Sequence, residues 1–252
     1  MMYHGIGGPD GVTPEAFERQ LEALAKRRRI VPLIDAVDSL GRAESGDLAA
    51  ITFDDGYRDF AEFALPILCA KRLHATLFVP AGWIGKRNGW DADRPQRQIL
   101  SIRELRELDP GTVTVGAHGL THTRLLRLQA KTLHAETATA RTILEDACGR
   151  AVTLYAYPYG QRDDFDMAAE RAVRDAGFIA ACSTIFGRSS RPDERFRLRR
   201  VGIGPQSSLT MVERMLDGAY DWTILKESLG ALSREAFRRG RESVGISHRR
   251  PY

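Results

Sequence analysis

The sequence predicts an α/β protein built as a distorted (β/α)7 TIM-like barrel, and three observations point to this fold class. Short apolar runs alternate with stretches of helical periodicity, which is typical of βαβ units. The length of 252 residues matches that of a common α/β barrel. No internal repeat or low-complexity linker divides the alternating region. We therefore expect one domain over residues 1–225, followed by a basic, arginine-rich and partly disordered tail over residues 226–252.

Each expected element has a local signal. Thr13 and Pro14 are typical of a helix N-cap and of the first helical position. Ser101 and Glu104 have the spacing of a capping box at the start of another helix. The other elements follow from apolar runs and their periodicity. Expected strands cover residues 1–6, 48–53, 75–80, 112–117, 152–157, 178–184 and 198–203, expected helices cover 14–28, 60–71, 101–108, 128–148 and 165–176, and a long loop covers 82–98.

Composition excludes several functional classes. No apolar stretch approaches the roughly 20 residues of a membrane helix, so no transmembrane segment is expected. The stretch MMYHGIGGPDG lacks the basic and apolar regions of a signal peptide, which predicts a cytoplasmic location unless an export signal has been trimmed. The net charge of +4 lies wholly in residues 226–252 without an aromatic and basic platform, so we expect no nucleic-acid partner. Three cysteines without CxxC spacing argue against a disulfide framework and a cysteine zinc site.

Polar residues follow two of the expected strands. ITFDDG places Asp54 and Asp55 after one strand, and VTVGAHGLTH places His118 and His122 after another. An Asp-Gly turn and a chance HxxxH spacing are the simpler interpretations. However, the carboxyl ends of parallel strands open on one face of a barrel, where such folds carry their chemistry. One carboxylate and two imidazoles suit Zn²⁺ with a position left open for water.

Further candidates lie elsewhere in the chain. The stretch YAYPYG contains the turn Pro158-Tyr159-Gly160, which could direct backbone N–H groups into a site or be an ordinary β-turn. His4, on an apolar strand, could be a core residue or a catalytic one. Trp83, in the long loop, could line a sugar-binding groove or anchor the loop to the core.

Three ordered motifs carry a family resemblance. TFDDG, the HxxxH pair and the PYG turn resemble those of the polysaccharide deacetylase family, which has the NodB homology domain and forms carbohydrate esterase family 4. The stretches YRDFAEFALPIL, ATLFVPAGWIG and EDACGRAVTLYAYPYG join the resemblance, which runs from about residue 1 to 200. It implies a distorted (β/α) barrel that hydrolyses N- or O-acetyl groups on sugars with a divalent metal ion.

The resemblance also assigns roles to residues. It implies that Asp54 is the general base, and that Asp55, His118 and His122 bind the metal ion. The backbone N–H of Tyr159 would stabilise the tetrahedral oxyanion. Zn²⁺ is the ion we expect from the ligand types, and Co²⁺, Ni²⁺ and Mn²⁺ also accept imidazole.

Two positions depart from the family pattern. Ala156 stands where the third motif often has an arginine directed toward the base, so the partner of Asp54 is open. The late histidine that usually serves as general acid is also missing. MMYHGI resembles the strand that a circularly permuted branch, which includes poly-N-acetylglucosamine deacetylases, moves to the N-terminus. We therefore expect His4 to protonate the leaving amine.

The function implied is metal-dependent hydrolysis of the N-acetyl group of N-acetylhexosamine units. The carbohydrate substrate would be an oligo- or polysaccharide, or a lipid- or nucleotide-linked precursor. Two alternatives stay open: a deacylase of a small non-polymeric amide or formyl-sugar, and a catalytically weak carbohydrate-binding barrel. The sequence leaves the oligomeric state and the role of the basic tail open.

Overall fold

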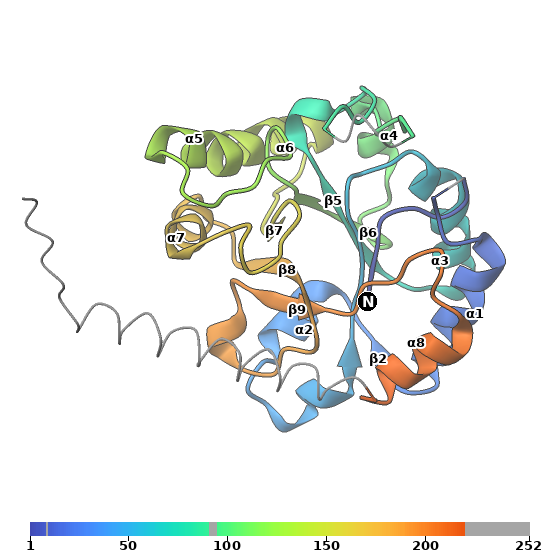
Figure 1. Cartoon of the computed structure of the whole chain (residues 1–252). Coiled ribbons are helices and arrows are strands. Elements are labelled where there is room, and N and C mark those ends of the chain that lie inside the picture. The colour runs from blue at the N-terminus through green and yellow to red at the C-terminus, as the bar shows by residue number, and fades with distance from the viewer. Residues whose placement is uncertain (9, 91–94, 220–252) are drawn as a thin grey trace, which may run out of the picture.

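The structure is a computed structural model that describes residues 1–8, 10–90 and 95–219 (Figure 1). The predicted boundary at residue 225 and the predicted tail over 226–252 lie outside the described residues. Within them, no helix is long and apolar enough to cross a membrane. The three cysteines are free.

Seven parallel strands form one sheet that curves into a barrel (Figure 1). Their order is β1-β4-β5-β6-β7-β8-β9. Met2 on β1 completes the circle, because its N–H donates to Val201 O (2.9 Å) and its carbonyl accepts from Ile203 N (2.9 Å). This confirms the predicted barrel. The strands are β1 (Met2–Tyr3), β4 (Ile51–Phe53), β5 (Ala75–Val79), β6 (Val113–Ala117), β7 (Leu154–Ala156), β8 (Ala180–Phe186) and β9 (Leu198–Arg200).

Helices surround the barrel (Figure 1). The predicted caps are present: Thr13 Oγ1 accepts from Ala16 N (3.2 Å), and Ser101 and Glu104 form a capping box. The α-helices are α1 (Pro14–Ala25), α2 (Leu33–Asp38), α3 (Leu65–Lys71), α4 (Ile102–Glu107), α5 (Ala130–His134), α6 (Ala140–Cys148), α7 (Met167–Asp175) and α8 (Leu209–Leu216).

Several elements differ from the prediction. The expected strand 48–53 is divided at Ala50: β3 (Leu48–Ala49) pairs with β2 (Arg29–Ile30) in a separate small sheet, whereas β4 joins the barrel. Helices α2 and α8 were not predicted. The predicted helices 60–71 and 128–148 each contain a π-helical turn, at Phe60–Ala64 and Ala135–Thr139.

Alternate strand residues divide the core into two parts. Leu77 and Val79 on β5 face the large apolar layer beneath the surrounding helices. Phe78, between them, belongs to a smaller cluster with Leu154, Ala156, Cys182 and Leu198 that fills the barrel interior. Leu33 and Val37 of α2 join this inner cluster and cover the end of the barrel where the strands begin. The opposite end, where the strands finish, carries the polar groups described next.

Candidate active site and metal centre

The candidate site lies at the carboxyl ends of β4 and β6. Asp54 and Asp55 directly follow β4, His118 directly follows β6, and His122 ends the short loop after it. Asp55 and His122 adopt left-handed backbone conformations, with φ of 72° and 61°. Such conformations cost about 1–3 kcal/mol each and persist only where the surroundings enforce them. The turns at both strand ends are therefore strained in a way that points to function.

Three of these residues present ligand atoms to a common point. The candidate ligand atoms of Asp55, His118 and His122 all lie within 4.8 Å of one another. Oδ1 of Asp55 is 3.5 Å from Nε2 of His118 and 3.2 Å from Nε2 of His122. Within the described residues, this buried oxygen accepts no hydrogen bond. Two imidazoles and a carboxylate are a donor set of open zinc sites, so these residues fit a divalent metal ion.

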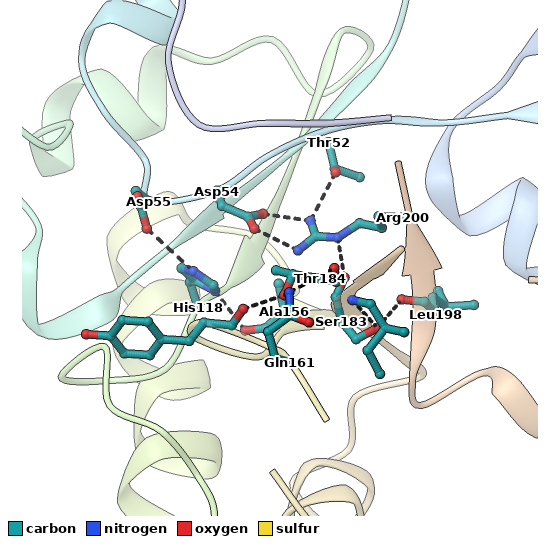
Figure 2. A network of polar contacts seen from close by, with 12 residues as sticks. Thr52, Asp54, Asp55, His118, Ala156, Gln161, Ser183, Thr184, Leu198 and Arg200 are labelled. Carbon is teal, nitrogen blue, oxygen red and sulfur yellow. Dashed lines mark hydrogen bonds and ion pairs between the residues drawn. The ribbon is translucent and has the colours of Figure 1, made fainter. Parts of the chain in front are cut away.

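The environment of His118 supports the fit. Its Nδ1 lies 2.8 Å from the carbonyl oxygen of Ala156, which can only accept, so Nδ1 donates and Nε2 carries the lone pair of the neutral ring (Figure 2). Burial alone would lower the pKa of His118, but Asp55 and Asp54 outweigh burial and raise it above its ordinary value. Burial would raise the pKa of Asp55, but His118 and His122, in their protonated form, outweigh burial and hold it well below its usual range. The site therefore attracts a cation.

Asp54 is held by a buried arginine. Figure 2 shows the guanidinium of Arg200, from β9, facing the Asp54 carboxylate. Nη1 donates to Oδ1 and Nη2 donates to Oδ2, each at 2.7 Å. Arg200 also donates from Nε to Ser183 O (2.7 Å) and from Nη1 to Thr52 Oγ1 (3.1 Å). Both charged side chains are buried, at 1% exposure for Asp54 and 5% for Arg200. A bidentate pair of this kind fixes both the position and the orientation of the carboxylate.

The arginine also fixes the charge of Asp54. Burial alone would raise the pKa of this carboxyl, but Arg200, with His118, outweighs burial and lowers the pKa below its ordinary value. The partner of Asp54 is thus Arg200 on β9, and not a residue at position 156 on β7, where an alanine stands. Sequence reasoning missed it. The available signal was an arginine two residues after the inner-facing Leu198, on the same face of the strand.

A cavity of about 820 Å³ opens over these groups. Its lining includes His4, which is exposed, together with both aspartates, both histidines, Tyr159 and Arg200. His4 directly follows β1, the strand that pairs with β4. The structure therefore brings His4 into the same cavity as Asp54 and Asp55.

The PYG turn borders the same cavity through Tyr159, whose φ is 60°. Pro158 and Gly160 on either side are buried, and Gly160 N donates to Pro158 O (2.7 Å). Arg124 stacks on the Tyr159 ring at 3.9 Å and pairs with Asp164 at 2.6 Å. Thr184 N on β8 donates to Gly160 O (2.9 Å), so the turn is held from the barrel side by a strand and from the solvent side by an arginine.

Trp83 lies behind the cavity lining. Its Nε1 donates to Thr121 O (3.1 Å), and its ring contacts Trp90 edge-on at 5.4 Å between centroids. Trp90 lines the cavity and stacks on the ring of His122 at 4.1 Å. Trp90 therefore contacts a candidate ligand directly, while Trp83 supports the loop between the two histidines.

The fold and the site together define a parallel α/β barrel with a candidate metal centre at the carboxyl ends of its strands. Comparison with known proteins gives the family. Residues 41–180 match the family model described as polysaccharide deacetylase. This chain therefore belongs to the polysaccharide deacetylase family, whose members are hydrolases acting on carbon–nitrogen bonds. Carbohydrates are accordingly the substrate class.

Individual relatives agree with this assignment. YxkH of Bacillus subtilis (strain 168), named among the polysaccharide deacetylases, is 26% identical over 213 residues, covering 82% of this chain and 72% of YxkH. The structure of IcaB from Ammonifex degensii matches with a TM-score of 0.73 and 24% identity, over 85% of this chain and 94% of IcaB. The structure of Streptococcus pyogenes deacetylase PplD in complex with acetate matches with a TM-score of 0.71 and 19% identity, over 86% of this chain and 96% of PplD. At these identities the two structures support the fold alone.

Proposed function

We propose that this chain hydrolyses the N-acetyl group of N-acetylhexosamine units in a polysaccharide or its precursor, using a divalent metal ion. Zn²⁺ is the ion that the two imidazoles and the carboxylate suit best, with Co²⁺, Ni²⁺ and Mn²⁺ as alternatives. Asp55, His118 and His122 would hold it. When bound, such an ion supplies Lewis acidity toward water and the acetyl carbonyl.

The observation that carries the proposal is the unequal environment of the two adjacent aspartates. Both oxygens of Asp54 are paired with Arg200, whereas Oδ1 of Asp55 faces two imidazole nitrogens. Asp54 is thereby kept apart from the candidate ligands but stays ionised in the same cavity. This arrangement supports one role in proton transfer and another in metal binding.

The chain's own residues would then act in sequence. Asp54 accepts a proton from the water that attacks the acetyl carbon, using the lone pairs that Arg200 leaves open. The backbone N–H of Tyr159 donates to the oxygen that gains negative charge. His4 protonates the amine nitrogen as the carbon–nitrogen bond breaks, so the products are acetate and a free amino sugar.

Metal analysis and acetate release test the proposal together. The purified protein should contain a divalent metal ion and release acetate from chito-oligosaccharides, and a chelator should abolish the release. Asp54→Asn should keep the metal and lower turnover by about 10²–10⁴-fold. Asp55→Asn should lose the metal. Equal metal content in the two variants would contradict the division of roles.

His4→Ala tests the proposed general acid. Turnover should fall by about 10²–10⁴-fold while metal content stays unchanged, because His4 is not among the candidate ligands. His134→Ala is a suitable control, since His134 lies on α5 and is exposed. Unchanged turnover in His4→Ala would remove this residue from the mechanism. Parallel assays with a nucleotide-linked N-acetylhexosamine separate polymer from precursor as substrate.

A further inference from the structure

A further buried carboxylate, besides Asp54 and Asp55, lies close to the candidate site. Glu136 is 2% exposed and lies in the π-helical turn Ala135–Thr139, which stands between α5 and α6. π-Helical turns are rare and occur frequently at functional sites. Leu133 and Thr137, on the same turns, are also buried, so this side of the helix faces the protein.

The Glu136 carboxylate receives its hydrogen bonds from the segment between the two histidines. Leu120 N donates to Oε2 at 2.7 Å, and Thr121 N donates to Oε2 at 3.1 Å and to Oε1 at 3.3 Å. The Thr121 hydroxyl donates to Oε1 at 2.5 Å. All of these donors are uncharged, so the carboxylate is stabilised by oriented dipoles. A negative charge bound this way fixes the backbone of residues 120–121 strongly.

Gly119 completes this contact from the other end of the segment. Its φ is +75°, and a Cβ built on it would lie 2.8 Å from Oε2 of Glu136. Only glycine adopts this conformation without strain and leaves room for the carboxylate. The glutamate and the glycine are therefore complementary in shape.

The carbonyl groups of the same segment are held from the opposite side. Ala81 N donates to Gly119 O (2.9 Å) and Gly82 N donates to Leu120 O (2.8 Å). The indole of Trp83 donates to Thr121 O (3.1 Å). Residues 119–121 are thus clamped between residues 81–83 and Glu136, directly before His122 takes its left-handed conformation.

We propose that Glu136 is a positioning residue for the metal centre: it holds residues 119–121 so that His118 and His122 converge on Asp55. Glu136 acts through the loop and not by contact with the metal ion. The inference rests on the proposed metal-dependent function. Outer groups that orient metal ligands typically contribute 10–100-fold in metal affinity.

Zn²⁺ affinity of the metal-free protein, measured by competition with a chromophoric chelator, tests this role without any substrate. Glu136→Ala should bind Zn²⁺ about 10–100-fold more weakly than the unsubstituted chain. Glu136→Gln should recover a large part of the affinity, because one amide oxygen can still accept from the two backbone N–H groups. Thr121→Val, which removes only the hydroxyl donor, should cause a smaller loss.

Two controls separate positioning from general destabilisation. Glu145→Gln changes a glutamate on α6 that accepts from Val152 N (3.0 Å) and Arg141 Nε (3.0 Å), away from the loop, and should leave the Zn²⁺ affinity unchanged. Leu144→Ala opens the core under the same helix and should lower the unfolding midpoint while leaving the affinity unchanged.

The outcomes distinguish the two proposals. If the unsubstituted chain binds no divalent ion, the proposed function fails. If it binds Zn²⁺ and Glu136→Ala binds equally well, only the positioning role is overturned. An affinity loss in Leu144→Ala as large as that in Glu136→Ala also overturns it, because the effect would then follow stability. Should Glu136→Ala not fold, an unchanged affinity in Thr121→Val overturns the proposal, because that variant removes a donor to Glu136.

Discussion

The carboxyl ends and the amino ends of the barrel strands differ in the side chains that they bury. At the carboxyl ends, Asp54 and Arg200 form a buried ion pair, and Asp55, His122 and Tyr159 adopt left-handed backbone conformations. At the amino ends, α2 covers the interior with apolar side chains, and the inner cluster is apolar. The buried Asp54–Arg200 pair and three of the five non-glycine residues with positive φ in the described chain thus lie around the polar cavity.

This difference shows where the stability of the site comes from. Charged and strained groups are costly to hold, and they persist only where neighbours compensate them. Here the compensation comes from distant parts of the chain: Arg200 supports Asp54 from β9, and Glu136 supports the histidine loop from a helix. The apolar amino end supplies the packing against which these groups are fixed.

Removing the buried arginine should have the largest effect. Arg200→Met leaves Asp54 buried without its partner, which should lower the free energy of unfolding by about 3–5 kcal/mol. Chemical denaturation measures this loss. Arg195→Met, which breaks the exposed pair with Asp38 near α2, should cost at most about 1 kcal/mol. Equal losses would show that burial does not distinguish the two pairs.

A glycine pair compares the strain of the two ends. Gly119→Ala forces a Cβ into a left-handed conformation next to Glu136, and should lower stability by about 1–3 kcal/mol. Gly46→Ala, in the 3₁₀ turn Ala43–Asp47 that precedes β3, meets no atom within 4 Å and should change stability by less than about 0.5 kcal/mol. Denaturation midpoints measured on both variants provide the test. Similar losses at both positions would contradict the contrast.

The smallest expected effect is a pH dependence at the amino end. His74 precedes β5, its Nε2 lies 3.2 Å from Thr114 Oγ1, and burial lowers the pKa of its imidazole below the ordinary value. Protonation is therefore easier in the unfolded chain. The contribution of His74 to stability is complete above the unfolded pKa, near about 6.5, and is lost as the pH falls toward the folded value.

The unfolding free energy, measured across this pH range, should increase with pH. Its slope should correspond to less than one proton taken up on unfolding. His74→Gln should remove that part of the slope. His134→Gln, at an exposed position on α5, should leave the slope unchanged. A slope that survives in His74→Gln would assign the dependence to other groups.

Much of the barrel and the residues of the candidate site could be predicted, because both leave local signals. Strand ends followed by Asp54-Asp55 and by His118 are visible as apolar runs that stop at polar residues. The predicted grouping of Asp55 with the two histidines agrees with the structure. The role of each residue remains a prediction that the variants above test.

The supports of the site could not be predicted, because their partners are far apart in the sequence. In the sequence, Arg200 is one of several arginines near the end of an expected strand. It contacts Asp54 only because the closed barrel brings the two residues together. Glu136 lies within a regular helical pattern, and a π-helical turn leaves no mark on that pattern. The division of residues 48–53 at Ala50 depends likewise on tertiary pairing with two different partner strands.

The closure of the barrel at Met2 has a consequence for the order of folding. The hydrogen bonds that close it join residue 2 to residues 201 and 203, so they span most of the described chain. Contacts of such long sequence separation form late, since the entropy of the intervening chain must be lost first. His4 and Arg200 lie directly beside this seam. During synthesis, the working site can therefore form only after the last strand has emerged and the two ends of the sheet have met.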